Sequence, residues 1–394
     1  MRIRTVSRSV TRLKLYILTV ILSISACDGA NSPLTSSDAE YHRTPLKDAE
    51  FVAQLPVVDL HNDRSFFISG RGIPFADCTG MHICATTLQA GDRYFFSIWR
   101  PPAPLIYVGR PWNLSAEQVS QLKSETHFAY VLRAIAEIER QTERRATRDP
   151  DSITNPDFKA LFLGIEGAYL IDNRPLDNYS DAPEENQLES MLLELKHRGV
   201  GYVAPVWSNP NPFGGVSGSS RGLTASGRTL VRLLLKHGFL IDLSHASDQL
   251  VRDVHALAGD EYPLFFSHSS VRSICNHPRN LDDRTLELVR QTDGMVGLNF
   301  YSPYINCEKG ATKADILAHL KYLRDRFGIS IIGFGSDFDA YARMPAGMNG
   351  PGDLRNLAGE LLQSGFSRTE VEAIYFRNLQ RVLRKIKPIS PNQR

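Results

Sequence analysis

Eight short apolar runs, separated by segments of helical periodicity, constrain the fold of this 394-residue chain more than any other feature. The runs cover residues 57–61, 94–99, 160–166, 202–207, 239–245, 264–268, 295–301 and 331–337. Their hydrophobicity is continuous rather than alternating, which is typical of strands buried on both faces. Amphipathic segments lie between and after them, at 116–144, 184–198, 224–237, 248–258, 282–292, 313–327, 352–364 and 368–386. Eight strand–helix repeats predict an α/β fold, a (β/α)₈ barrel of the TIM type.

Nearly every apolar run ends in a polar residue. Three histidines and three carboxylates stand at or just after these ends: His61, Asp63, Glu166, His245, His268 and Asp337. The C-terminal ends of the strands of such a barrel meet at one mouth, so we expect these six side chains to converge there. His61 and Asp63 are two positions apart and therefore face the same side of their strand. Imidazoles and carboxylates together are typical ligands of zinc.

Glu166 follows the apolar sequence LFLGI, so its carboxylate is predicted to be buried. A buried carboxylate needs a cation or strong hydrogen-bond donors beside it. Two Zn²⁺ ions, bridged by Glu166 and by a hydroxide, meet that need and create a nucleophile at neutral pH. The sequence therefore predicts a binuclear centre with two Zn²⁺ per chain.

The first residues have the composition of an export signal. Residues 1–26 contain five basic residues and no acidic one, and their apolar stretch at 15–24 is too short to span a bilayer. The stretch ends in the sequence ISAC, which resembles the cleavage site of bacterial lipoproteins and predicts a lipidated Cys27. The alternative is an ordinary secretory cleavage site beside an incidental cysteine. Asp28 resembles an inner-membrane retention signal, so we expect a periplasmic lipoprotein, with the inner membrane slightly favoured.

These features divide the chain into four predicted parts. They are a signal peptide at 1–26, a lipidated cysteine with a flexible tether at 27–50, a barrel domain at 51–388 and a tail at 389–394. The formal net charge is +2 and becomes negative once residues 1–26 are removed. The sequence has no basic patch of the kind that would indicate a nucleic-acid partner. Contact with the membrane is expected through the lipid anchor only, and a homodimer is compatible with the sequence.

Four cysteines remain in the predicted mature chain, an even number that suits an oxidising compartment. Three pairings are open. Cys78 and Cys84 are neighbours in one loop, which favours the pairs Cys78–Cys84 and Cys275–Cys307. A zinc-finger interpretation is weak, because the chain has no close C-x-x-C pair.

Seven short motifs resemble those of the membrane (renal) dipeptidase family of amidohydrolase-like metallopeptidases. They are DLHND at 59–63, GIEG at 164–167, IDLSH at 241–245, FSHSS at 266–270, RN at 279–280, NFY at 299–301 with Tyr304, and GSDFD at 335–339. The motifs occur in the order of the family and span residues 51 to about 385. The resemblance implies a zinc-dependent dipeptidase that cleaves small dipeptides with a metal-bridging hydroxide.

The resemblance also implies roles for individual residues. One zinc would be held by His61, Asp63 and Glu166, and the other by Glu166, His245 and His268. Asp337 would handle the proton, and Arg279 would bind the C-terminal carboxylate of the substrate. Tyr304 and Asn280 would lie at the bound substrate, and the family places a disulfide at Cys275 and Cys307.

One departure from the family concerns Trp207, which stands where the family commonly has a histidine that contacts the scissile carbonyl. Indole offers a single N–H donor and no titratable group, so we expect Trp207 to line the substrate site but to replace that histidine only partly. A smaller departure is Asp339-Ala340 in place of Asp-Gly. Two alternatives stay open. One is a related metallo-amidohydrolase acting on β-lactams, N-acyl amino acids or peptide-derived metabolites, and the other is a lipoprotein that binds ligand or metal without turnover.

Overall fold

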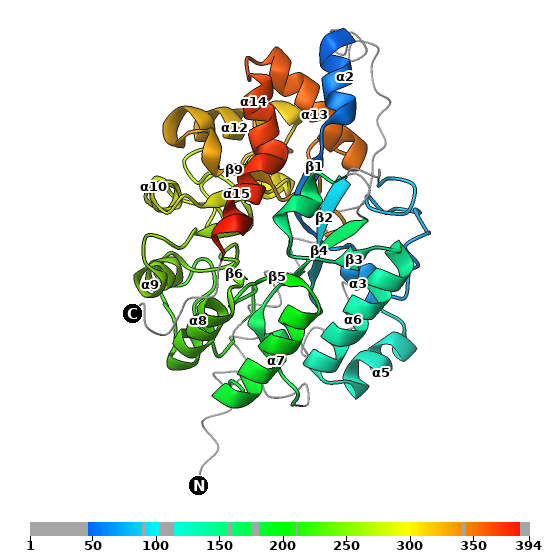
Figure 1. The fold of residues 1–394 in the computed structure, drawn as a ribbon, viewed down its shortest axis with the longest axis vertical. Coiled ribbons are helices and arrows are strands. Elements are labelled where there is room, and N and C mark those ends of the chain that lie inside the picture. The colour runs from blue at the N-terminus through cyan, green and yellow to red at the C-terminus, as the bar shows by residue number, and fades with distance from the viewer. Residues whose placement is uncertain are drawn as a thin grey trace.

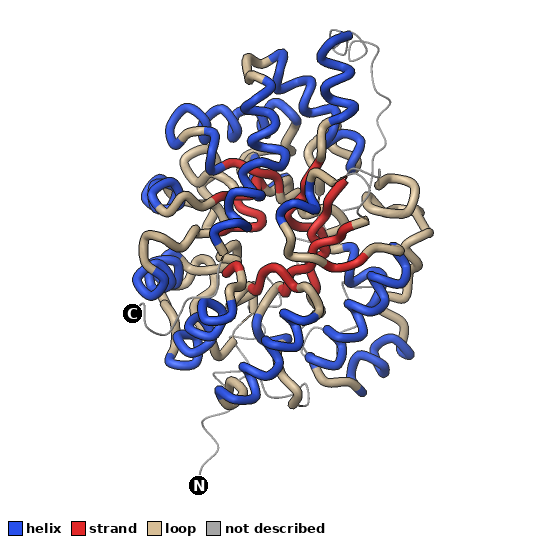
Figure 2. Tube along the Cα trace, in the orientation of Figure 1, coloured by secondary structure: helices blue, strands red, loops and turns tan. Residues whose placement is uncertain are grey.

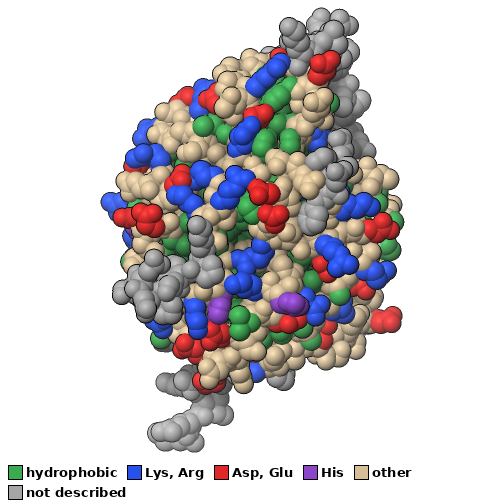
Figure 3. All heavy atoms as spheres, viewed as in Figure 1, with side chains coloured by type: hydrophobic (Ala, Val, Ile, Leu, Met, Phe, Trp, Pro, Cys, Tyr) green, Lys and Arg blue, Asp and Glu red, His purple; other side chains and the backbone are tan. Residues whose placement is uncertain are grey.

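The computed structural model describes residues 46–88, 92–101, 114–155, 159–174, 181–209, 211–340 and 343–386. The predicted signal peptide, Cys27, Asp28 and the tail at 389–394 lie outside this part of the chain. Strands surround the centre of the molecule and helices lie outside them (Figures 1 and 2). Acidic and basic side chains are interspersed over the face seen in Figure 3. None of the described helices is long and apolar enough to cross a membrane.

Each of the eight predicted strands overlaps a strand of the structure. These are β1 (Val57–Asn62), β2 (Asp92–Ile98), β4 (Ala160–Ile165), β5 (Val200–Val203), β6 (Leu240–Ile241), β7 (Phe265–Ser269), β8 (Met295–Leu298) and β9 (Ile332–Phe334). Every residue in them is buried, in agreement with their continuous hydrophobicity. A further short strand, β3 (Arg145–Ala146), pairs with the start of β4 and was not expected.

All strand pairs in the described chain are parallel, and they follow the chain order. The sheet β1-β2-β4-β5-β6 is followed by the sheet β7-β8-β9. Isolated parallel bridges connect the two sheets, from Asp242 to Phe265 on one side and from Asn62 to Phe338 on the other. The α/β class is therefore confirmed, and this topology is consistent with a TIM-like barrel.

Helices follow most of the strands. They are α2 (Leu46–Gln54), α3 (Arg64–Ser69), α5 (Ala116–Ser124), α6 (His127–Thr142), α7 (Glu185–His197), α8 (Ala225–His237), α9 (Asp248–Ala258), α10 (Asp283–Gln291), α11 (Ser302–Ile305), α12 (Lys313–Phe327), α13 (Pro351–Gln363), α14 (Arg368–Glu372) and α15 (Asn378–Lys385). Short 3₁₀ turns occur at η2 (Pro150–Ile153), η3 (Ala168–Leu170) and η4 (Ile329–Ile331). Helix α2 begins within the range 27–50 that the sequence assigns to a tether.

Two predicted helices are divided in the structure. The segment 116–144 forms α5 and α6, because Glu125 and Thr126 are extended and the Thr126 side chain caps the second helix by accepting from the Ala129 amide. The segment 368–386 contains a π-helical turn, η5 (Ala373–Arg377), between α14 and α15.

Candidate metal centre

The six predicted metal-site residues all lie at the C-terminal ends of the strands. His61 is in β1 and His268 in β7, Asp63 and Glu166 follow β1 and β4 closely, and His245 and Asp337 lie in the segments after β6 and β9. All except Asp337 are buried, and the Asp337 side chain is only 14% exposed. The structure therefore brings together the whole set that the sequence singled out.

The facing atoms of this group are within a few ångströms of one another. His61 Nε2 lies 3.5 Å from Asp63 Oδ1 and 3.7 Å from both Glu166 Oε1 and Asp337 Oδ1. Glu166 Oε1 in turn lies 2.8 Å from His245 Nε2 and 3.6 Å from His268 Nε2. Two groups have ligand atoms close enough to hold an ion, namely His61 with Glu166 and His268, and His61 with Asp63 and Asp337.

The electrostatics of the group call for a cation. Burial raises the pKa of Glu166 well above its usual range, and the charges of Asp63 and Asp337 raise it further. Burial and the charge of Asp339 raise the pKa of Asp63 in the same way. Burial lowers the pKa of His245 and of His268 well below the usual value, so both imidazoles are neutral.

A divalent cation fits this donor set. His61 Nε2 and Asp63 Oδ1 are buried and have no hydrogen-bond partner among the described residues. Neutral imidazoles with free lone pairs and carboxylates crowded together are ligands in the form that zinc binds, and the metal charge offsets the repulsion between the carboxylates. The residues present therefore fit the metal that the sequence predicts.

Hydroxyl groups orient two of the imidazoles from behind. The Ser267 hydroxyl donates to Asp242 Oδ2 at 2.6 Å, so its oxygen accepts from His268 Nδ1 at 2.7 Å. The Ser208 hydroxyl lies 3.0 Å from His245 Nδ1. Such contacts fix the ring orientation and leave Nε2 facing the centre. The sequence analysis did not single out these three partners.

The third imidazole, His61, is oriented by Tyr202. The Tyr202 hydroxyl lies 3.2 Å from His61 Nδ1. Its ring passes over Gly164 of the neighbouring strand β4, where a Cβ atom would lie 2.0 Å from the ring. Gly164 in the GIEG motif therefore makes room for the side chain that holds a candidate metal ligand.

Asp337 is held at the edge of the centre by an unusual backbone conformation. Its φ is +62°, in the left-handed region that aspartate adopts more readily than most residues. The Asn299 side-chain amide donates to Asp337 Oδ2 at 3.0 Å, and the Asp337 amide donates to the His61 carbonyl at 3.1 Å. Burial and the charge of Asp63 raise the pKa of Asp337, so this carboxylate holds a proton more readily than a free one.

Arg279 is buried beside His245 and His268. Its Nη2 is 3.3 Å from His245 Nε2 and 3.5 Å from the His268 carbonyl oxygen. Its Nη1 is buried without a hydrogen-bond partner among the described residues. The guanidinium lies 5.6 Å from the ring centre of Tyr304, and burial raises the pKa of Tyr304 to about 12. Arg279 thus presents an unused donor beside the cluster.

Asn280 lies beside Arg279 and is fully buried. Its side-chain amide donates to the carbonyls of Cys275 and Tyr304, both at 2.8 Å. The amide nitrogen is therefore used to hold the loop that carries Tyr304. Asn280 Oδ1 is buried without a hydrogen-bond partner among the described residues, and its place at the substrate stays a prediction. Both predicted disulfides, Cys78–Cys84 and Cys275–Cys307, are present in the structure.

Trp207 is half-buried beside the cluster. Its ring stacks on Trp99 at a centroid distance of 5.7 Å and an angle of 20°, and lies 6.3 Å from the ring of His245. The indole therefore contacts Trp99, which directly follows β2, and lies near His245, a candidate metal ligand.

Comparison with known proteins identifies the family. A family model described as membrane dipeptidase, peptidase family M19, matches residues 47–394. The chain therefore belongs to the membrane dipeptidase family of metallopeptidases, as its motifs suggested. Dipeptidase verJ of Clonostachys rogersoniana is 26% identical to it over 374 residues, which cover 91% of each chain. An uncharacterized dipeptidase of Schizosaccharomyces pombe is 32% identical over 226 residues, 56% of this chain and 51% of that protein.

Solved structures of metallopeptidases share the fold. The structure of dipeptidase AC has a TM-score of 0.68 and 24% identity, and the match covers 85% of this chain and 100% of that one. A metallopeptidase from Rhodobacter sphaeroides, liganded with a phosphinate mimic of the dipeptide L-Ala-D-Ala, has a TM-score of 0.68 and 25% identity. That match covers 84% of this chain and 99% of that one.

Proposed function

We propose that this dipeptidase-family protein is a zinc enzyme that hydrolyses small dipeptides at the cluster described above. The observation that carries the proposal is the juxtaposition of the three-histidine, three-carboxylate group with the buried, unpartnered Nη1 of Arg279. The dipeptide mimic bound by the Rhodobacter sphaeroides relative supports a substrate of this size.

Two Zn²⁺ ions per chain would be held by His61, Asp63, Glu166, His245 and His268, with Glu166 between them. When bound, the zinc ions would lower the pKa of a water molecule and polarise the scissile carbonyl. Glu166 suits the bridging position because its Oε1 lies within 3.7 Å of all three imidazoles.

Asp337 and Arg279 would act on the substrate itself. Asp337, with its raised pKa, would accept a proton from the attacking water and deliver it to the leaving amine. Arg279 would donate a hydrogen bond from Nη1 to the C-terminal carboxylate and so position the scissile bond at the metal centre. Tyr304 would pack against the same end of the substrate through its contact with the guanidinium.

A panel of dipeptides, tripeptides and acylated amino acids tests this proposal. We expect hydrolysis of unblocked dipeptides, its loss after chelation and its return with Zn²⁺. A protein that is folded and zinc-loaded but cleaves none of the dipeptides would refute the proposed substrate class.

Trp207 supports a second candidate, a related metallo-amidohydrolase acting on β-lactams, N-acyl amino acids or peptide-derived metabolites. The half-buried Trp207, which stacks on the buried Trp99, offers an aromatic surface beside His245, which suits a ring or acyl group. Higher kcat/KM on such amides than on every dipeptide would favour this candidate.

We further propose that the chain is exported and anchored by a lipid on Cys27. The support is the sequence of residues 1–27 alone. Cys27→Ser should move the protein from the membrane fraction to the soluble fraction without lowering its activity. Retention of the variant in the membrane fraction would contradict the anchor.

A further inference from the structure

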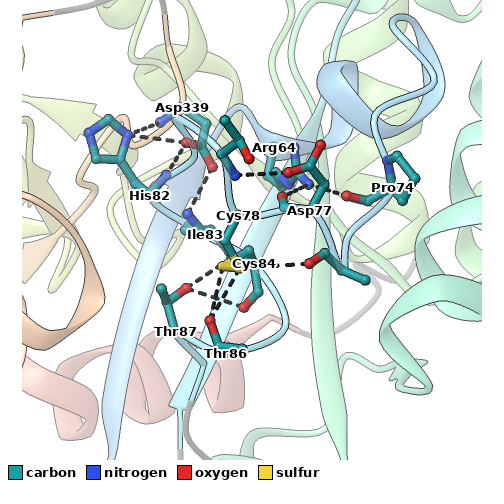
Figure 4. The surroundings of a disulfide bond; sticks show 12 residues. Arg64, Pro74, Asp77, Cys78, His82, Ile83, Cys84, Thr86, Thr87 and Asp339 are labelled. Carbon is teal, nitrogen blue, oxygen red and sulfur yellow. Dashed lines mark hydrogen bonds and ion pairs between the residues drawn. A yellow bond between two sulfur atoms is a disulfide. The ribbon is translucent and has the colours of Figure 1, made fainter.

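The loop closed by the Cys78–Cys84 disulfide is bound to the segment that follows Asp337 (Figure 4). The carboxylate of Asp339 accepts the backbone amide of His82 at 2.6 Å and that of Ile83 at 3.1 Å. The His82 ring adds a contact between Nδ1 and Asp339 Oδ1 at 3.1 Å and stacks on Phe338 at 5.3 Å. The Asp339 side chain is fully buried beneath the loop.

The segment held in this way connects directly to the metal centre. Asp337 and Asp339 both have a φ of +62°, so two left-handed residues that are not glycine stand two positions apart. This backbone conformation is uncommon outside glycine and persists where the surroundings hold it. Between them, the Phe338 carbonyl accepts the amide of Asp63 at 2.8 Å. A shift of this turn would therefore move Asp337 and the Asp63 backbone together.

A second anchor ties the loop to the same side of the centre. Arg64, the neighbour of Asp63, is buried and donates through Nη2 to the carbonyls of Pro74 at 2.6 Å and Asp77 at 3.1 Å (Figure 4). Asp77 directly precedes Cys78, and Pro74 lies four positions before it. The loop is thus fixed on one side through Arg64 and on the other through Asp339.

We propose that the Cys78–Cys84 loop positions Asp63 and Asp337 in the metal centre, and that Asp339 is the positioning residue through which it acts. The inference rests on the proposed dipeptidase reaction. The disulfide closes the loop on a short span. The backbone amides of His82 and Ile83 are thereby held next to each other, and both donate to the Asp339 carboxylate. The opposite side of the centre, with His245, His268 and Arg279, makes none of these contacts.

The test compares the double variant Cys78→Ser/Cys84→Ser with the wild type and with Thr79→Ala, an exposed residue of the same loop. We expect the double variant to lose about ten- to a hundredfold in kcat, because small displacements of a proton-transfer group have effects of this size. KM should be unchanged, since Arg279 is untouched. The d–d absorption bands of the Co²⁺-loaded protein should change, because Asp63 is displaced.

Variants of Asp339 separate positioning from folding. Asp339→Asn keeps an acceptor for the His82 amide and should retain more of kcat than Asp339→Ala, at equal metal content. Wild-type kcat and an unchanged Co²⁺ spectrum in the double variant, with only a lower Tm, would overturn the inference. Equal losses in Asp339→Asn and Asp339→Ala would also overturn it. If the wild type cleaves no dipeptide, the proposed reaction fails, whereas the Co²⁺ spectra still test the loop.

Discussion

Replacing Arg279 by methionine removes a buried cation that has an unused donor beside the candidate metal centre. Methionine keeps the length and apolar packing of the side chain but removes the charge. Nη1 is buried and unpartnered, so it can form a dry, charge-assisted bond with a substrate carboxylate. Truncating one partner of such a bond costs about 2–5 kcal/mol. This predicts a loss of roughly 30- to 4,000-fold in kcat/KM on dipeptides.

The assay compares each dipeptide with its C-terminal amide. Arg279→Met should lower kcat/KM on the free acid and leave turnover of the amide, where it occurs, unchanged. Arg272→Met shows the effect of loosening the loop alone, because Arg272 pairs with Asp248 at 2.8 Å and donates to the Asn280 carbonyl at 2.7 Å. An equal loss on acid and amide would show that Arg279 supports the fold of its loop rather than binding the carboxylate.

Three further variants test the surroundings of the centre. Ser267→Ala removes the hydroxyl behind His268 Nδ1 and should weaken zinc binding about ten- to a hundredfold in chelator competition; unchanged affinity would show that the ring is held by packing. Trp207→His should raise kcat on small dipeptides about ten- to a hundredfold; a lower Tm without that gain would indicate a packing role. Burial lowers the pKa of His319 from 6.5 to about 4, so its stabilising effect is present above pH 6.5 and lost as the pH falls toward 4. In the metal-free protein, the free energy of unfolding should therefore change by about 3 kcal/mol less between these pH values in His319→Gln than in the wild type, as measured by denaturation at several pH values. The same pH profile in both proteins would contradict the lowered pKa of His319.

The sequence carried enough information to predict the order of the strands and the candidate metal ligands. Strands buried on both faces leave a continuous apolar signal, and side chains at their C-terminal ends must converge in a parallel barrel. His61, Glu166 and His268 could therefore be placed together before any coordinates were known. The break between α5 and α6 could not be predicted, because the amphipathic pattern of residues 116–144 continues across the Thr126 cap.

Sequence patterns could not predict the contacts that hold the candidate metal ligands and Asp337 in place. Asp339 meets His82 across 257 positions, and His61 meets Tyr202 across 141, with no periodicity that links the partners. Asn280 was predicted at the substrate from the family motif at 279–280, and its contacts with the carbonyls of Cys275 and Tyr304 could not be predicted from that motif. Such contacts depend on the three-dimensional course of loops, which hydrophobic spacing does not encode.

The zinc content of the purified, active protein tests the central claim most directly. Elemental analysis of the protein, assayed in parallel on a dipeptide, should give close to two zinc per chain. His245→Ala, which removes the imidazole 2.8 Å from Glu166, should lose one of them together with most of the activity. Full activity with one zinc per chain or none, unaffected by chelator, would contradict the binuclear centre.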